Sequence, residues 1–526
     1  MQDSSVYLVG GGLASLASAF YLIRDTKIKA ENIHILEQDD ILGGSLDGSG
    51  NSERGFLIRG GRMHEAHFVC YWDLLSSIPS FDNPSLSIKD ETFQFNNQFV
   101  SNAQARLIKH GQVIRDPSFG LSLKQKLDLS RLSLKAESKL DNLRIEDWFD
   151  LDFFETNFWY LWTSMFAFQR WSSLIQMRRY MRRFIHLVDG LPHLRGIMRT
   201  KYNQYHSVVV PLERYLREKN VQFELQTQVK DVDFDLTETK KTAVAIHVIN
   251  KLGKKSAIKL NESDYVFITN GSITDGSSVG SWSQAPTLKD QSSSGAWTLW
   301  KTLAKKDKSF GQPSVFCDQI DLQKWYSFTV TLESSIFTDY MQDLSGNIDG
   351  TGGLVTLCDS NWLMSFVIAR QPHFPNQPDN IKVFWGYGLY ADKLGNKVKK
   401  KMSDCSGREI LEELWFHLNI EALMMPLMED GKINCLPVAL PFIDSLFMPY
   451  AAGDRPEVVP TGATNFAFLG QFAEVPKDCV FTVEYSVRTA HVAVTQLFNT
   501  KKRVPPVYDS IHKLGILMKA IRALSK

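Results

Sequence analysis

The residues with the clearest chemical meaning are a run of glycines near the start of the chain. The segment Val9-Gly10-Gly11-Gly12-Leu13-Ala14-Ser15 fits the GxGxx(G/A/S) pattern. Gly10 permits a tight turn, Gly12 lets the backbone approach a pyrophosphate, and small Ser15 lets the following helix pack on the strand. Glu37 ends the next apolar run, where an acid accepts hydrogen bonds from ribose hydroxyls. The pattern predicts binding of an adenine dinucleotide without a 2′-phosphate.

Further turns favour FAD as that dinucleotide. In flavoproteins of the amine-oxidase type, similar segments wrap the pyrophosphate and the flavin, and a late strand returns to close over the cofactor. Each segment alone would be an ordinary turn, but their combination predicts FAD. The candidate contacts, besides Gly10, Gly12, Ser15 and Glu37, are Gly44, Ser45, Arg59, Gly61, Arg62, Asn270, Gly271, Ser272, Gly470 and Gln471.

One tyrosine lies in an unusually basic and aromatic segment. Tyr180 has Arg178 and Arg179 before it and Arg182 and Arg183 after it. Nearby cations favour a phenolate, so this sequence predicts a phenol with a lowered pKa. The plainer alternative is an aromatic side chain packed in a basic helix.

The elements that would position these residues follow from hydrophobic periodicity. Residues 6–9, 13–24 and 33–37 indicate a strand, a helix and a strand, and 121–140 a basic amphipathic helix. Aromatic residues dominate a helical pattern from Asn142 to Thr200. Strands are expected within 202–249 (VVVPL, FELQTQV, VAIHVI) and 325–390, a loop over 272–294, a strand within 458–472 and a helix over 480–493.

These elements predict an α/β fold with α+β insertions. Residues 1–135, 201–300 and 430–500 are expected to form a discontinuous Rossmann-like FAD-binding domain. A helical cap over 136–200 would line the substrate site. Residues 301–429 would form a β-rich substrate-binding domain, and 501–526 a basic amphipathic C-terminal helix.

Composition excludes several classes of protein. With 526 residues, 44% hydrophobic and 22% charged, the chain is neither disordered nor fibrous. The net charge of +1 gives no field for nucleic acid. The six cysteines form no CxxC pair, and no basic secretory signal starts the chain. We therefore expect reduced thiols and a cytoplasmic protein, with the uncharged stretch Val6–Ile23 buried rather than spanning a membrane.

The C-terminal segment has a pattern of its own. Apolar residues recur at helical spacing from Ile511 to Leu524, and Lys513, Lys519, Arg522 and Lys526 lie among them. A basic amphipathic helix of this kind can lie on an anionic membrane. Docking on the body of the protein or on a partner chain is an equally good interpretation.

Short motifs spread along the chain are collinear with those of one family. They are Arg59-Gly60-Gly61-Arg62 with His67-Phe68 and Trp72-Asp73-Leu74, Phe166-Ala167-Phe168-Gln169, Arg179-Tyr180-Met181 with Arg183-Phe184-Ile185-His186, Tyr202-Asn203-Gln204-Tyr205, Arg370-Gln371-Pro372-His373-Phe374, and Phe481 to Arg488. In these motifs the chain resembles the FAD-dependent fatty acid hydratases (oleate hydratases, also called myosin-cross-reactive antigens).

The resemblance implies an activity and its residues. Such enzymes add water to a cis double bond of a free unsaturated fatty acid, giving a hydroxy fatty acid, and need FAD without net redox change. It implies Tyr180 as the proton donor and Thr482 as a cofactor contact. The fatty-acid carboxylate would meet Arg370, Gln371 and His373. Many members are homodimers associated with membranes, which adds a homodimer and a peripheral membrane contact to the expectations.

Two departures from the family pattern affect the expected site. The family usually has Glu directly after Arg-Gly-Gly-Arg, where this chain has Met63, whose thioether cannot accept a proton. Glu65 or His64 is the candidate substitute, and we expect a slower or differently tuned hydratase rather than an inactive one. The Thr and Asn usual before Arg-Gln-Pro-His are Val367 and Ala369 here, which predicts weaker or relocated headgroup binding.

Other functions and sites remain open on the sequence. A flavin-dependent lipid oxidoreductase or isomerase is one alternative, because Met63 could turn the site toward hydride chemistry. A non-catalytic FAD and fatty-acid binding homologue is another, since the usual Glu, Thr and Asn are all absent. No metal is expected, because no third ligand can be placed beside the His64-Glu65-Ala66-His67 segment.

Overall fold

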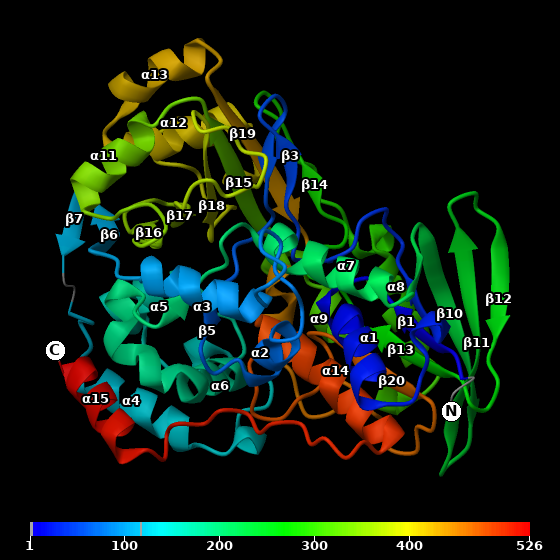
Figure 1. The fold of residues 1–526 in the computed structure, drawn as a ribbon. Coiled ribbons are helices and arrows are strands. Elements are labelled where there is room, and N and C mark those ends of the chain that lie inside the picture. Colours follow the sequence, from blue (N-terminus) through cyan, green and yellow to red (C-terminus); the bar gives the residue numbers. More distant parts are fainter. Residues whose placement is uncertain (1–3, 116–117, 526) are drawn as a thin grey trace.

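A parallel five-stranded sheet forms the centre of one half of the protein. The computed structural model describes residues 4–115 and 118–525. The strands β1 (Val6–Val9), β2 (Ile33–Leu36), β9 (Gln222–Glu224), β13 (Tyr265–Thr269) and β20 (Phe466–Leu469) lie in the order β20-β13-β1-β2-β9 (Figure 1). Every pairing is parallel, and the central strands are apolar and buried, as parallel sheets require. The expected α/β fold with a discontinuous Rossmann-like sheet is confirmed.

Helices and a small sheet surround these strands. Helix α1 (Leu13–Asp25) lies between α14 (Val483–Phe498) and α7 (Val210–Glu218) (Figure 1). The antiparallel strands β10 (Thr227–Leu236), β11 (Lys241–Asn250) and β12 (Lys255–Lys259) form the outer edge, where α8 packs against β10. The remaining helices of this half are α2 (Val69–Leu75), α3 (Ile88–Gln98), α8 (Gly295–Ala304), α9 (Pro313–Cys317) and α10 (Ile320–Gln323). The hairpin β3 (Ser49–Asn51) with β4 (Gly55–Leu57) packs instead on the second large sheet.

The expected strand at VVVPL is wrong. Residues Tyr205–Val209 form a π-helical turn that continues into α7. Pro211 occupies the first turn of α7, where its fixed φ suits a helix. Leu212 and Leu216 are buried one turn apart on the same face. The β-branched residues of VVVPL favour a strand when they are considered alone. The helical spacing of apolar residues can be recognised only when the residues that follow are included.

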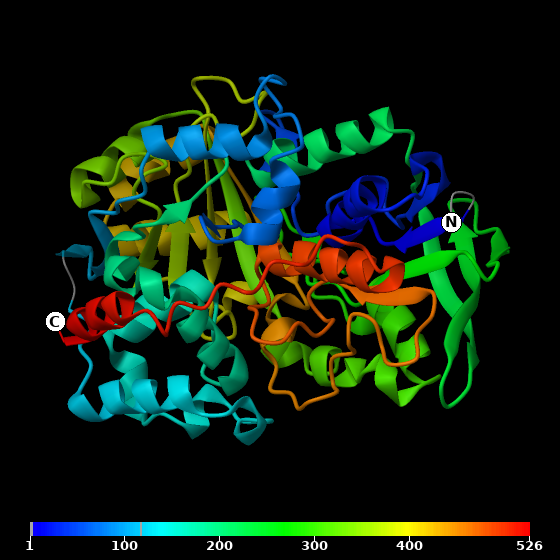
Figure 2. The same ribbon diagram turned by 60° about the horizontal axis from the view of Figure 1, so that its bottom comes forward.

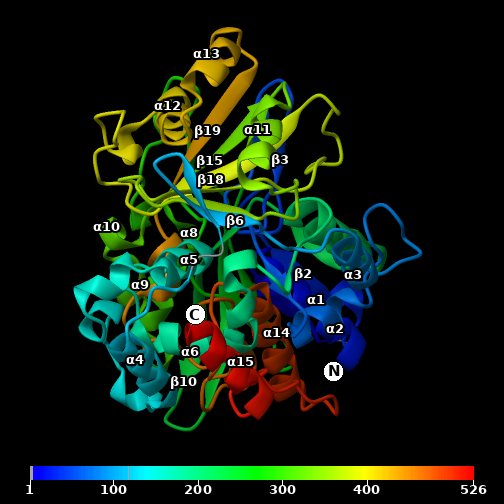
Figure 3. The same cartoon turned by 90° about the vertical axis from the view of Figure 1, so that its left-hand side faces the viewer.

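An eight-stranded sheet forms the other half, with the order β14-β19-β15-β18-β17-β16-β6-β7. Its strands are β6 (Ala105–Lys109), β7 (Gln112–Arg115), β14 (Ser278–Val279), β15 (Trp325–Leu332), β16 (Leu354–Leu357), β17 (Met364–Val367), β18 (Lys382–Gly388) and β19 (Ile433–Leu440). Helices α11 (Ile336–Ser345), α12 (Gly407–Leu418) and α13 (Glu421–Glu429) lie on its outer side (Figures 1 and 3).

The expected domain boundaries need correction at this sheet. Strands β6, β7, β14 and β19 come from the segments assigned to the dinucleotide domain, yet all four pair in the eight-stranded sheet. Conversely, Phe316, from the segment assigned to the substrate-binding domain, packs its ring on Phe472, beside the parallel sheet. Contacts between remote segments decide both placements, and a linear sequence does not display those contacts.

Helices cap the space between the two large sheets. The cap contains α4 (Leu123–Leu134), α5 (Asn157–Phe166), α6 (Leu174–Phe184) and the 3₁₀ helix η5 (Ile185–His193). Helix α4 packs on α6, so the cap begins before residue 136. Below the cap, β5 (His64–Glu65) pairs with β8 (Ile197–Met198). This short ladder fixes the chain that follows Arg62 against the cap.

The C-terminal segment crosses from α14 to the cap (Figure 2) and ends in helix α15 (Leu514–Ser525), which packs on η5. Its predicted basic residue Lys526 lies outside the described residues. Among the residues described, no helix combines the length and apolarity needed to cross a bilayer. All six cysteines are free thiols, and only Cys358 is not fully buried.

Candidate functional site

The β1–α1 turn opens on a cavity of about 1060 Å³, called here the glycine-lined cavity. Gly10 has a φ of +92°, which favours glycine, and a Cβ built at Gly12 would meet no atom within 4 Å. The N-terminus of α1 also faces this space, as anion binding requires. Eleven of the predicted cofactor residues line it: Gly10, Gly12, Glu37, Gly44, Ser45, Arg59, Asn270, Gly271, Ser272, Gly470 and Gln471.

Two polar side chains in this wall suit a dinucleotide. Glu37 accepts hydrogen bonds from the N–H groups of Gly11 (2.5 Å) and Asp39 (2.9 Å), and burial raises its pKa to about 7. The buried amide of Asn270 has no hydrogen-bond partner for its oxygen or its nitrogen among the described residues. Such an orphaned group is costly unless a ligand satisfies it. The residues present therefore fit a polar ligand of dinucleotide size.

The other predicted cofactor residues have different positions. Ser15 is buried away from the cavity. Its hydroxyl lies 3.3 Å from that of Thr269, and its small side chain lets α1 pack against β13. Gly61, Arg62 and Thr482 line a second space. Arg59 lines both spaces, so the glycine-lined cavity and the second one adjoin at its side chain. A ligand longer than the glycine-lined cavity can therefore continue into the second.

This second space, the aromatic cavity, encloses about 1550 Å³ between the cap and the eight-stranded sheet. Apolar side chains provide most of its wall, including Phe166 and Phe184 of the cap and Trp325 and Trp385 of the sheet. Its apolar lining suits an apolar ligand.

Tyr180 lies in the wall of the aromatic cavity and is fully buried. Its hydroxyl donates a hydrogen bond to the carbonyl oxygen of Val480 at 2.5 Å. The rings of Phe166 and Phe168 meet its ring edge-on, with centroids 4.9 and 5.0 Å away. Burial raises its pKa well above 10, although Arg62 partly opposes this. The expected lowering of the pKa is wrong.

The flanking arginines explain that error, because acids elsewhere neutralise them. Arg178 and Arg179 both bind Glu137 at 2.9 Å. The neighbours Arg182 and Arg183 also have acidic partners: Arg182 pairs with Asp509 at 2.6 Å, and Arg183 with Glu65 at 2.9 Å. Burial and the charges of other residues, such as Asp478 and Arg62, therefore determine the pKa of the phenol. Residues adjacent in sequence point in different directions around a helix.

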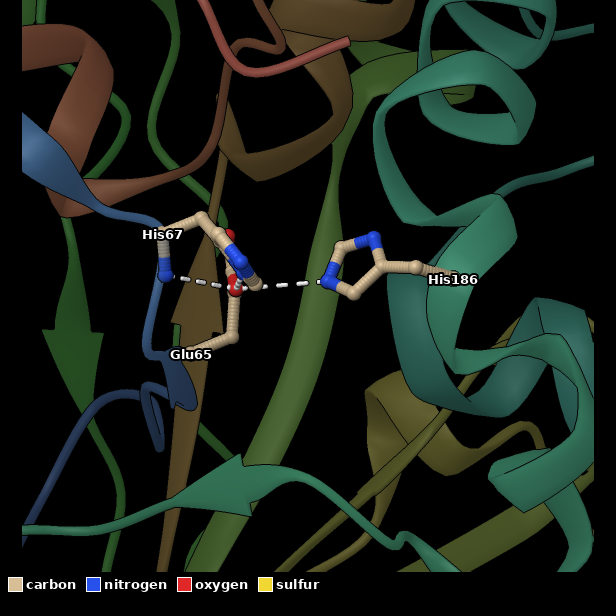
Figure 4. A group of neighbouring side chains, drawn as sticks. All are labelled: Glu65, His67 and His186. Carbon is tan, nitrogen blue, oxygen red and sulfur yellow. Dashed lines mark hydrogen bonds and ion pairs between the residues drawn. The ribbon is translucent and has the colours of Figure 1, made fainter. Parts of the chain in front are cut away.

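Glu65 lies at the centre of a group of basic side chains (Figure 4). One carboxylate oxygen binds Arg183, and the other lies 2.9 Å from Nδ1 of His67 and 3.4 Å from Nε2 of His186. These partners lower its pKa to about 2. The ring of Tyr508 stacks on His67 at 3.7 Å. Glu65 is thus ionised, weakly basic and held mainly by ion pairs.

The same group contains three residues able to ligate a metal, with the ligand atoms of Glu65, His67 and His186 within 4.8 Å of one another. The sequence pointed to no third ligand, and the structure supplies His186 from η5. Because Arg183 places a positive charge 2.9 Å from the same carboxylate, the ion pair already accounts for this arrangement.

The two residues before Glu65 line the aromatic cavity as well. Met63 is half-buried there and offers only a thioether. His64 is buried, with its Nε2 3.2 Å from the hydroxyl of Tyr71, while its Nδ1 has no partner among the described residues. Burial and the charge of Arg62 lower its pKa to about 3. The imidazole is therefore neutral at physiological pH.

The predicted headgroup residues are only partly brought together. Arg370 and His373 line the aromatic cavity, and so do the apolar Val367 and Ala369. Gln371 does not, because its amide nitrogen binds the carbonyl oxygens of Ala369 (2.8 Å) and Val383 (3.0 Å). Arg370 lies over the ring of Phe99 at 4.4 Å.

Arg199, another lining residue, was not predicted from the sequence. Its guanidinium is buried in the wall of the aromatic cavity, and none of its nitrogens has a hydrogen-bond partner among the described residues. The only local signal was its position before the Tyr202-Asn203-Gln204-Tyr205 motif. That position says nothing about partners, so the residue could not be distinguished from a paired arginine.

Comparison with known proteins identifies the family. A sequence profile of the MCRA family matches residues 3–495. The chain is 42% identical over 536 aligned residues to an oleate hydratase of Streptococcus pyogenes serotype M49 (strain NZ131), covering 100% of this chain and 90% of that protein. The chain belongs to the MCRA family. A linoleate hydratase of Lactiplantibacillus plantarum, 32% identical over 94% of this chain and 93% of its own length, is a more distant relative.

Solved structures relate the fold of this MCRA family protein to that of amine oxidases. Cyclohexylamine oxidase from Brevibacterium oxydans IH-35A and a putrescine oxidase both superpose with a TM-score of 0.53 over 94% of this chain and 99% of theirs. Sequence identities are only 13% and 12%. The likeness therefore shows a shared architecture.

Proposed function

We propose that the chain is an FAD-dependent fatty acid hydratase. The observation that carries the proposal is the pair of adjoining cavities. One has the glycine turn and orphaned amide that suit a dinucleotide, and the other is mostly apolar, with the buried phenol of Tyr180 in its wall. The identity of 42% to an oleate hydratase over the whole chain supports the same activity.

Residues of the glycine-lined cavity would hold FAD, and Arg59, Gly61, Arg62 and Thr482 would hold its other end. Gly10, Gly12 and the N-terminus of α1 would bind the pyrophosphate. Glu37 would accept hydrogen bonds from the ribose, and Asn270 would gain the hydrogen bonds that it lacks in the protein alone. Bound FAD would supply a planar, polarisable ring system, and hydration itself would transfer no electrons to it.

The chemical step proceeds by proton transfer. The phenol of Tyr180 donates its proton to one carbon of the double bond, water forms the C–O bond at the other, and water's proton returns to the protein. The raised pKa keeps the phenol protonated before reaction. The rings of Phe166, Phe168 and Phe184 pack around Tyr180, and a ring face turned toward the alkene would attract developing positive charge.

His64 is the best candidate to receive the water proton. Glu65 is ion-paired with Arg183 and lies against two histidines, which makes it a very weak base, and Met63 has no basic atom. By contrast, Nδ1 of His64 has no partner and the ring lines the aromatic cavity. When Nε2–H donates to Tyr71, Nδ1 keeps its lone pair for water. Its low pKa makes it a weak base, which agrees with the expectation of a slow hydratase.

The deciding experiment incubates the purified protein with FAD, a reductant and oleic or linoleic acid under inert gas in ¹⁸O-water. A hydroxy fatty acid that carries one ¹⁸O supports the proposal. Turnover-linked flavin reoxidation or a shifted double bond would instead indicate the oxidoreductase or isomerase alternative. Bound fatty acid without product would indicate a binding protein.

The remaining proposal concerns the membrane. Leu517, Ala520 and Leu524 of α15 line an apolar cavity of about 880 Å³ that also contacts Phe166 and Phe184 of the aromatic cavity. The adjoining face exposes apolar side chains, Leu514 by 71% and Met518 by 59%. A helix that is docked on one face and exposes apolar side chains on the next suits an anionic bilayer, from which a fatty acid could reach the site.

Vesicle binding tests this contact. Replacing Leu514 and Met518 together by Glu should weaken binding to phosphatidylglycerol vesicles at least tenfold, because each buried side chain contributes about 1.5–3 kcal/mol. Leu252, 87% exposed in the β11–β12 turn, is the matched control, and Leu252→Glu should leave binding unchanged. Equal binding by all three proteins would reject the contact. A homodimer, also expected from the resemblance, is tested by light scattering of the same samples.

A further inference from the structure

Arg199 is an unusual buried cation. It directly follows β8, and its guanidinium lies in the wall of the aromatic cavity. Its Nε and both Nη atoms are buried without a hydrogen-bond partner among the described residues. Burial alone lowers its pKa to about 10, so the group keeps its charge at neutral pH. An isolated buried charge is among the least favourable arrangements in a protein unless a ligand compensates it.

Within the described part of the chain, no acid forms an ion pair with Arg199. The groups that interact with it electrostatically are His373, whose pKa it helps to lower to about 4, and Arg106, whose pKa it also lowers. His206 adds to the same effect on His373. This end of the cavity is therefore a region of positive potential with an apolar wall, which attracts an anion.

Two other arginines that line or adjoin this cavity do have partners. Arg106 is fully buried and donates hydrogen bonds to the carbonyl oxygens of Leu191 (2.7 Å) and Leu354 (3.3 Å). Arg370 stacks on Phe99, and its charge acts on Asp349. The guanidinium of Arg199 binds neither an acid nor a carbonyl among the described residues.

We propose that Arg199 is the anchor for the carboxylate of the fatty acid. The inference rests on the proposed function, since it assumes that the aromatic cavity takes a fatty acid. A carboxylate would satisfy the free guanidinium with charge-assisted hydrogen bonds, and His373 lies beside it to contribute one more. Val367 and Ala369 are apolar at positions where the family has hydrogen-bonding residues. They cannot bind the carboxylate, so Arg199 would bind it instead.

The dinucleotide is a poorer occupant for the same charge. Its phosphates would lie at the β1–α1 turn, in the glycine-lined cavity, and Arg199 lines only the aromatic cavity. A free carboxylate on an apolar chain matches both the charge of Arg199 and the apolar wall around it. The position of the carboxylate thus determines the direction in which the fatty acid enters the aromatic cavity.

Binding of saturated ligands tests the anchor without requiring catalysis. With the FAD-loaded protein, Arg199→Gln should weaken binding of dodecanoate 10- to 100-fold, the loss expected for a hydrogen bond to a charged group. Binding of 1-dodecanol should change less than threefold, and Arg199→Lys should restore part of the dodecanoate affinity. A loss for acid and alcohol alike would mean that Arg199 acts only through packing, and would overturn the proposal.

Melting without lipid separates an anchor from a structural arginine. Removing an uncompensated buried charge should leave the melting temperature of Arg199→Gln equal or higher, and should abolish the increase caused by dodecanoate. A marked fall without lipid would overturn the proposal. So would an unchanged dodecanoate affinity, or a loss seen with Arg370→Gln in its place. If the wild-type protein forms no hydroxy acid but these differences hold, the hydratase function fails and the anchor stands.

Discussion

Replacing Tyr180 by Phe removes one oxygen atom from the wall of the aromatic cavity and nothing else. The hydroxyl makes a single hydrogen bond, to the carbonyl of Val480, while the ring is held by its aromatic neighbours. Leaving a buried acceptor unsatisfied costs about 1–3 kcal/mol, so the variant should fold and bind FAD. Loss of the proton donor should lower kcat 10²- to 10⁴-fold.

Tyr450 provides the matched control. It is also a buried tyrosine with one hydrogen bond, from Nε2 of Gln176 at 2.9 Å, but it does not line the aromatic cavity. Tyr450→Phe should lose similar stability in a urea titration and keep its turnover. The assay is the formation of hydroxy fatty acid from oleate in ¹⁸O-water, with flavin absorbance measured on the same samples. Turnover of Tyr180→Phe within threefold of the wild type would refute the role of the phenol as donor.

Further predictions concern the other residues of the site. Met63→Glu places a carboxylate in the aromatic cavity and should raise kcat at least tenfold if a base is missing, whereas Met63→Gln should not; equal rates for both would exclude the carboxylate effect. Glu65→Gln should destabilise the protein by about 3–5 kcal/mol at pH 7, because Arg183 loses its partner, and calorimetry checks this. His64 and His373 have folded-state pKa values of about 3 and about 4, below the 6.5 of an unfolded histidine. Their contribution to the free energy of unfolding is therefore present above pH 6.5 and is lost as the pH falls. At pH 5 this should cost about 2 kcal/mol for each histidine, and urea titrations at pH 7 and pH 5 that gave equal stability would contradict it.

Local chemistry could be predicted from the sequence, and remote pairing could not. Gly10 and Gly12 need only their neighbours to form the turn on which the glycine-lined cavity opens. The pKa of Tyr180 depends instead on where four arginines point and on which acids arrive from other segments. Arg199 was missed for the same reason, because the absence of a partner is a property of the folded chain.

A loop of five residues connects several of the motifs that lie far apart in the sequence. In residues 478–482, Asp478 binds Arg488 at 2.8 Å and lies 3.9 Å from Arg183. The next residues include Val480, the acceptor for Tyr180, and Phe481, whose ring lies 4.8 Å below Arg62.

Helix α14 ties this loop to the opposite side of the site. Its residue Glu484 binds Arg488 at 2.6 Å and accepts hydrogen bonds from the backbone of Cys70 and Tyr71. The charged residues of these motifs therefore form a buried network that holds α14, α6 and α2 together. The network fixes the position of the Tyr180 phenol. The charged motif around Tyr180 could therefore identify the site, although it gave the wrong direction for the pKa of the phenol.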